Sequence, residues 1–227
     1  MRAHTDREYE HELQDLQDRL LLMATRVEEM LSRALRAFAE GDAALARDTI
    51  ALDSAVDGDE LDIDERSLLL LARRQPMGSD LRFVTFALKL VTDLERIGDL
   101  AGNICGKVAE ASAPQALPMP ADLQRLGERV QGMVRLAIDA FVSRDLAKAQ
   151  RVLDQDKAVD DLYHDLFRAL LATMSADHAD VDRCVRVQHI AKSLERIGDH
   201  ATNVAEQVIF LVNGQDVRHR SRLAPTR

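Results

Sequence analysis

The sequence predicts an all-α protein made of two tandem three-helix bundles, with six long helices in an internal pseudo-two-fold repeat. The first observation behind this prediction is a repeated run, Glu-Arg-Ile-Gly-Asp, which occupies residues 95–99 and again residues 195–199. The second is the spacing of apolar residues, which recur every three or four positions and nowhere alternate for long. The composition agrees, because only 4% of the residues are aromatic and the abundant Ala, Leu, Arg and Glu favour helices.

Three helices are expected in the first repeat, which we assign to residues 1–113. The first helix has an apolar seam and ends before the break offered by Gly41-Asp42. The second covers about residues 43–74, since Pro76 cannot continue a helix. The third is expected to begin at a cap from Ser79 or Asp80. The seam residues are Leu13, Leu16, Leu20, Met23, Val27, Met30 and Ala34 in the first helix and Leu81, Val84, Leu88, Val91, Leu94, Ile97, Ala101, Ile104 and Val108 in the third.

A proline-rich segment, residues 114–120, is expected to link the repeats. The second repeat, residues 121–227, shows the same pattern again. A fourth helix opens at Leu123, a fifth covers about residues 146–174, and a sixth stops at Asn213-Gly214. The last eleven residues contain four arginines and no acid, so we expect a solvated basic tail rather than a contact arm.

The net charge and the apolar pattern of the chain exclude several classes of function. The chain has a formal net charge of −9 despite its basic end, which argues against binding to nucleic acid or to anionic membranes. It contains no apolar run of about 18 residues, so no transmembrane segment is expected. Cys105 and Cys184 fit no CxxC pattern and lie among apolar residues, which is typical of reduced core cysteines in a cytoplasmic protein.

Each copy of the repeated run carries two carboxylates one helical turn apart, which therefore project from the same face of a helix. A second motif, Asp-x-Ala-Val-Asp, begins at residue 53 on the second helix of the first half and at residue 156 in the second half. If these helices are neighbours, each bundle presents four carboxylates toward one place. The candidate metal ligands are Asp53, Asp57, Glu95, Asp99, Asp156, Asp160, Glu195 and Asp199, with Asn103 and Asn203 as weaker additions.

Like charges four residues apart destabilise a helix, so four gathered carboxylates favour a multivalent cation among them. Oxygen ligands suit magnesium, calcium, manganese or ferric iron, and zinc is possible. The alternative is a solvated acidic face without metal, which the many further acids of residues 59–65 favour locally. His200 follows Asp199 and is expected to be a surface residue rather than a ligand.

Gly98 and Gly198 are a second anomaly, because a glycine inside a helix costs about 1 kcal/mol relative to alanine. The chain tolerates this cost at the same place in both repeats. Close approach of a neighbouring helix is the simpler explanation, and the approach of a metal cluster is the other.

Several longer segments carry further signatures: Ala-Arg-Arg-Gln-Pro at 72–76, Ser-Asp-Leu-Arg at 79–82, residues 93–99, residues 193–203 and the ending at 214–219. Together these segments resemble the signatures of the PhoU family, and the resemblance covers nearly the whole chain. The resemblance implies two three-helix repeats, and it implies iron or zinc clusters on the E(D)xxxD motifs, held by the candidate ligands named above. The second half lacks the Gln-Pro…Asp-Leu-Arg segment, so a partner contact of the first half need not recur there.

The resemblance also implies a role. Family members act as cytoplasmic negative regulators of the phosphate-starvation response, adaptors between the ATPase subunit of the phosphate ABC transporter and a membrane sensor histidine kinase, and are often homodimers. No catalytic activity is implied. Two alternatives stay open: a carboxylate-bridged di-metal enzyme, although the Glu-x-x-His motifs of ferritin-like sites are absent, and a metal-free helical scaffold.

Overall fold

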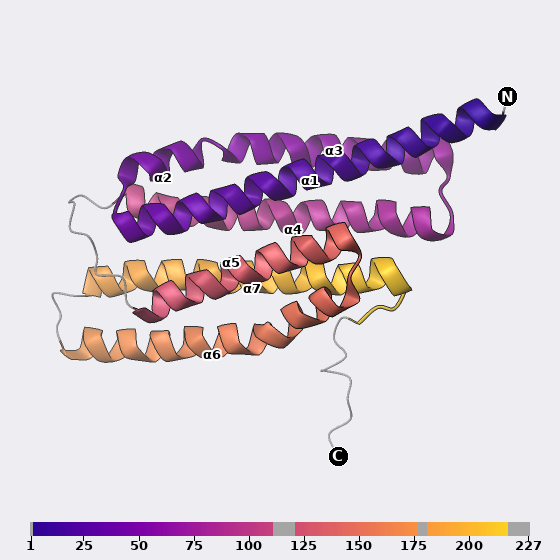
Figure 1. Cartoon of the computed structure of the whole chain (residues 1–227). Helices are drawn as coiled ribbons and strands as arrows, with labels where there is room; N and C mark the ends of the chain where they lie inside the picture. Colours follow the sequence, from indigo (N-terminus) through magenta and orange to yellow (C-terminus); the bar gives the residue numbers. More distant parts are fainter. Residues whose placement is uncertain (1, 111–120, 177–180, 218–227) are drawn as a thin grey trace, which may run out of the picture.

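The computed structural model describes residues 2–110, 121–176 and 181–217, and it describes side chains from Arg7 onward. These residues form seven helices and no strand, which confirms the all-α prediction. Four helices make the first bundle and three the second (Figure 1). The predicted linker and most of the basic tail lie outside the described residues. The helices are α1 (Arg2–Glu40), α2 (Ala43–Ile50), α3 (Asp53–Arg74), α4 (Gly78–Ala109), α5 (Ala121–Ser143), α6 (Leu146–Ala176) and α7 (Val181–Asn213).

The predicted second helix is in fact two helices, because the chain turns at residues 51–52 between α2 and α3. The hydroxyl of Thr49 donates to the carbonyl oxygen of Leu45, and that of Ser54 donates to the carbonyl oxygen of Ala51. Bonds of this kind also occur inside unbroken helices, as from Thr85 to Leu81 in α4, and the break itself lies in the backbone, where the amide of Leu52 donates to the carbonyl oxygen of Thr49, three residues back. The matching helix of the second repeat, α6, runs unbroken through the same place.

The start of α4 also differs from the prediction. The helix begins at Gly78, and Met77 precedes it without a side-chain cap. Asp80 instead accepts a hydrogen bond from the Tyr9 hydroxyl of α1 at 3.0 Å, which ties the two helices together near their beginnings. Gln75 ends α3 with a left-handed φ of 48°, so the chain reverses there.

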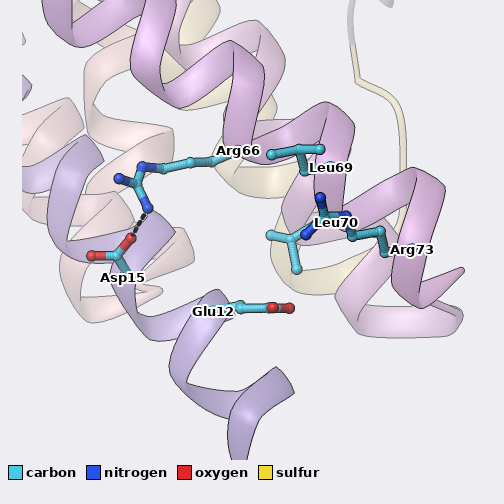
Figure 2. A pocket seen from close by; sticks show the side chains of 6 residues that line it. All are labelled: Glu12, Asp15, Arg66, Leu69, Leu70 and Arg73. Carbon is cyan, nitrogen blue, oxygen red and sulfur yellow. Dashed lines mark hydrogen bonds and ion pairs between the residues drawn. The ribbon is translucent and has the colours of Figure 1, made fainter.

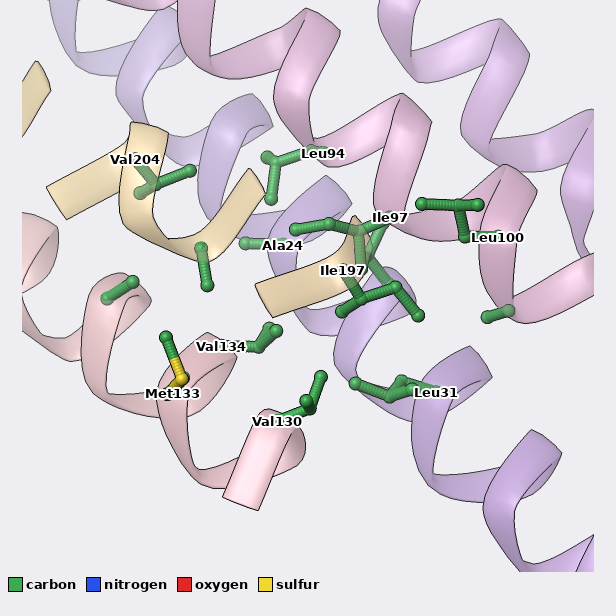
Figure 3. Close-up of a cluster of buried hydrophobic side chains, with 14 of the residues drawn as sticks. Ala24, Leu31, Leu94, Ile97, Leu100, Val130, Met133, Val134, Ile197 and Val204 are labelled. Atoms are coloured by element: carbon green, nitrogen blue, oxygen red, sulfur yellow. The ribbon is translucent and has the colours of Figure 1, made fainter. Parts of the chain in front are cut away.

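The two repeats share one hydrophobic core instead of two separate ones. α4 and α7 pack against each other in the middle of the molecule, with α3 and α6 on the outside (Figure 1). Figure 3 shows side chains from both repeats meeting in this region. Each buried Leu or Ile stabilises the fold by about 1.5–3 kcal/mol. The labelled residues are Ala24, Leu31, Leu94, Ile97 and Leu100 from the first repeat and Val130, Met133, Val134, Ile197 and Val204 from the second.

Other expectations can be placed on this fold. Cys105 and Cys184 are buried free thiols, as expected of core cysteines. None of the described helices combines the length and the apolar character that crossing a bilayer requires.

Candidate metal centres

The acidic motifs of α3 and α4 lie together because a glycine lets the two helices approach closely. A Cβ atom placed on Gly98 would lie 3.4 Å from a methyl group of Val56. Gly98 stands between Glu95 and Asp99 on α4, and Val56 stands within the Asp-x-Ala-Val-Asp motif of α3. The contact therefore brings the two acidic pairs of the first repeat against each other.

The second repeat uses the same device. A Cβ atom on Gly198 of α7 would lie 3.3 Å from a methyl group of Val159 of α6. Val159 stands between Asp156 and Asp160, just as Gly198 stands within the repeated run. Close helix packing is thus sufficient to account for the helical glycines in both repeats, without a metal cluster.

In the first repeat the clustering perturbs Glu95 most. Burial, followed by the charge of Asp99, raises the pKa of Glu95 to about 7, although Arg96 opposes the shift. Burial also raises the pKa of Asp53, helped by the charges of Asp57 and Asp99. Acids from both helices therefore share one electrostatic environment.

Glu60 is a further member of the first cluster that the sequence analysis did not select. Burial raises its pKa, and the charges of Asp64, Asp57 and Asp99 add to the effect. Its position three residues after Asp57 puts both on one face of α3. That spacing was visible in the sequence, but it was hidden among the other acids of residues 59–65.

In the second repeat Asp199 is the most perturbed acid. The residue keeps an exposed surface, yet partial burial, followed by the charges of Glu195, Asp156 and Asp160, raises its pKa to about 6. The pKa of Asp160 is also raised, first by burial and then by Asp156 and Glu195. The four predicted acids of this repeat thus influence one another across α6 and α7.

Basic side chains already compensate part of this charge. The Nε atom of Arg96 lies 3.3 Å from Glu95, and its Nη1 atom lies 3.2 Å from Asp99. In the second repeat the ammonium of Lys192 donates to both carboxylate oxygens of Glu195, at 2.7 and 2.6 Å. Both clusters therefore have cationic neighbours, but these come from different positions.

The donor set suits a hard cation, but the side chains do not converge on a single point. Within the described residues, no group of three His, Cys, Asp or Glu side chains is arranged to hold a metal ion. Among the candidate ligand atoms, Oε2 of Glu95 is buried without a hydrogen bond, and Nε of Arg96 lies 3.3 Å from it. The helix positions therefore fit a cation site, and the present carboxylate rotamers do not form one.

The two asparagines have different surroundings. Both are exposed to a similar degree, Asn103 on α4 and Asn203 on α7, and the difference is one hydrogen bond. The amide nitrogen of Asn203 donates to Asp93 at 3.2 Å, so this side chain faces α4. The structure therefore uses Asn203 in packing between the repeats.

His200 is not the surface residue that the sequence suggested. Its Nδ1 atom lies 2.8 Å from Asp93, and only 19% of its side-chain surface is exposed. Gln207 donates to the same carboxylate at 2.6 Å, together with Asn203. Asp93 on α4 is buried and is held by three side chains of α7, which links the first repeat to the second.

The model of the PhoU domain family matches this chain twice, over residues 20–108 and 123–208. The chain is similar to the phosphate-specific transport system accessory protein PhoU homolog of Pseudomonas aeruginosa, with 38% identity over 217 residues, 95% of this chain and 90% of the relative. It is also 35% identical to the phosphate-specific transport system accessory protein PhoU of Escherichia coli K12 over 219 residues, which cover 96% and 91% of the two chains.

Solved structures show the same arrangement. The crystal structure of PhoU from Pseudomonas aeruginosa matches with a TM-score of 0.86 and 37% identity, over 91% of this chain and 100% of that one. The crystal structure of the phosphate transport system regulatory protein PhoU from Streptococcus pneumoniae matches with a TM-score of 0.85 and 28% identity, over 92% and 99%. The comparisons therefore cover nearly all of each protein.

Proposed function

Because this chain belongs to the PhoU family, we propose that it is an accessory and regulatory protein of a phosphate-specific transport system. The observation that carries the proposal is the presence of two family repeats along the chain, together with relatives of nearly equal length that bear this name. The same relatives are named as accessory or regulatory proteins, which favours a role without catalysis.

The finer part of the proposal concerns partners. The protein acts in the cytoplasm as a negative regulator of the phosphate-starvation response, contacting the ATPase subunit of the transporter and a membrane sensor histidine kinase. It does so as a homodimer. Support comes from the family signatures at residues 72–82 and 193–203 and from the long helices, which offer extended surfaces to other proteins.

The proposal extends to metal binding at the two carboxylate clusters, with iron, zinc, magnesium or manganese as candidate ions. The ligands are Asp53, Asp57, Glu95 and Asp99 in the first repeat and Asp156, Asp160, Glu195 and Asp199 in the second. When bound, the metal neutralises carboxylates that now repel one another. The glycine contacts already hold the helices in place, so only side-chain torsions have to change.

A metal-free scaffold is the second candidate, and one observation favours it. Arg96 and Lys192 already lie against the acidic pairs, so part of the repulsion is relieved without metal. This alternative keeps the regulatory role and changes only the meaning of the clusters.

A genetic experiment tests the regulatory role. Deleting the gene should leave the phosphate-starvation genes active in high phosphate, and the wild-type gene should restore repression. Normal repression in the deletion strain would contradict the proposed regulation.

A separate measurement tests the metal. Protein purified without chelator should contain metal, and the double variant Asp99→Ala, Asp199→Ala should retain less while keeping its helix content. Less than one equivalent per bundle, with unchanged stability in EDTA, would leave the metal-free scaffold as the better description.

A further inference from the structure

We propose that the outer face of α3 binds the same face of a second copy of this chain, with the two α3 helices antiparallel. The inference rests on the homodimer in the proposed function and adds the surface that forms it. A dimer of this kind has a two-fold axis, so the surface must be complementary to itself.

The outer face of α3 is apolar where a surface helix is normally polar. Leu61, Leu68 and Leu69 expose 71%, 59% and 39% of their surface, and their spacings of seven and eight residues place them along one side of the helix. Met77, just beyond the end of α3, is 83% exposed. Single exposed leucines are common, but an aligned group marks a contact surface.

The charges on this face complement those of a second, antiparallel copy. If the two-fold axis passes at Leu69, residues equally far before and after it face each other. Glu65 then meets the partner subunit's Arg73, while Leu68 and Leu69 of both copies lie next to the axis. Glu65 and Arg73 are both exposed, and their charges act within the described chain only at longer range, that of Glu65 on Arg66 and that of Arg73 on Glu12. The two-fold symmetry forms this charge pair twice.

A shallow pocket lies beside Leu69 on this surface. It lies between α1 and α3, has a volume of about 140 Å³ and is floored by Leu70 (Figure 2). Arg66 closes one side through its ion pair with Asp15 at 2.5 Å, and Arg73 stands at the other end. The pocket offers an apolar side chain of the partner subunit a place to pack.

The second repeat does not present the same surface. Counting from the Asp-x-Ala-Val-Asp motifs, Leu171 of α6 corresponds to Leu68, but His164 replaces Leu61 and Ala176 replaces Arg73. Arg168, which replaces Glu65, already pairs with Asp165 at 2.6 Å. Of the two repeats, the first therefore carries both the apolar row and an exposed pair of complementary charges.

Sedimentation or light scattering of the full chain over a wide range of concentration tests the surface. Leu68→Glu should weaken the dimer by about tenfold or more, because it places two like charges in an apolar contact. Leu171→Glu is the matched control and should leave the dimer intact. Circular dichroism should show unchanged helix content for both variants, since both positions are exposed.

A charge exchange makes the test specific. Arg73→Glu alone and Glu65→Arg alone should each weaken the dimer, and the double variant should restore it. A wild-type protein that stays monomeric would overturn both the proposed homodimer and this surface. A dimer that resists Leu68→Glu and the single charge variants, or that is lost equally in Leu171→Glu, would overturn the surface and leave the homodimer standing.

Discussion

The two repeats hold the same acids at the same helix contact but surround them differently. In the first repeat Glu60 adds a fifth carboxylate, where the second repeat has Tyr163. A second position also differs: the second repeat has Lys192, which donates to Glu195, and the first repeat has Thr92 at the equivalent place. The two repeats therefore share the close helix contact at the glycine, but they differ in the polar residues around the carboxylates.

A second difference concerns the aspartate that begins each pair on α3 and α6. The hydroxyl of Thr202 donates to Asp156 at 3.0 Å. The corresponding residue of the first repeat is Gly102, whose missing Cβ atom would lie 4.0 Å from Asp53. Asp53 therefore lacks this donor, and its raised pKa reflects burial among other acids. The first cluster has more uncompensated negative charge than the second.

The largest effect is expected from disrupting the glycine contact that both repeats share. Leu in place of Gly98 or Gly198 would have to push aside Val56 or Val159, so we expect each variant to lose about 1–3 kcal/mol of unfolding free energy. Denaturant titration measures the loss. Gly106→Leu is the control on α4, because nothing lies within 4 Å of its Cβ position and helix propensity should improve. Equal behaviour of the three variants would show that the glycine contact does not set the helix approach.

The next prediction sharpens the contrast between the clusters. If cations bind, removing charge from the first repeat with Glu95→Gln and Asp99→Asn should cost more Mn²⁺ affinity than the same changes at Glu195 and Asp199. The reason is that Lys192 lies 2.6 Å from Glu195, whereas Arg96 lies 3.3 Å from Glu95 and 3.2 Å from Asp99, so Lys192 competes more strongly with a bound cation. Calorimetric titration with Mn²⁺ should show a difference of about tenfold, and equal losses would mean that the surrounding residues do not matter.

The pH dependence of stability should single out Glu95. Its pKa is raised from 4.5 to about 7 in the folded protein, so the folded state binds this proton more tightly than the unfolded chain does. The wild type therefore gains stability as the pH falls from about 7 toward 4.5, and it lacks this gain above 7.

The variant Glu95→Gln isolates that contribution. It should be more stable than the wild type above pH 7, and the difference should disappear well below pH 4.5, where the carboxyl is protonated in the unfolded chain as well. Urea unfolding at several pH values, in the presence of a chelator, gives the comparison. A difference that does not change with pH would show that Glu95 titrates normally.

Sequence reasoning reached the repeat, the all-α class and the acidic pairs because each depends on local spacing. It missed the turn between α2 and α3, where the amide of Leu52 donates to the carbonyl oxygen of Thr49, three residues back. It also misplaced His200, whose partner Asp93 lies 107 residues away in the sequence. No spacing rule indicates such a contact, since it arises only when the two repeats pack together.

The smallest expected effect comes from removing one hydrogen bond in the second cluster and supplying an equivalent donor in the first. Thr202→Val removes the hydroxyl that donates to Asp156 and should cost about 1 kcal/mol, since the aspartate then loses a partner in a partly buried place. Gly102→Thr supplies a hydroxyl near Asp53 and replaces a helical glycine, so this variant should be more stable by about 0.5–1 kcal/mol. Denaturant titration measures both. If both variants lose stability, the space around Gly102 matters more than the missing donor, and the contrast between the repeats is one of packing and not of hydrogen bonding.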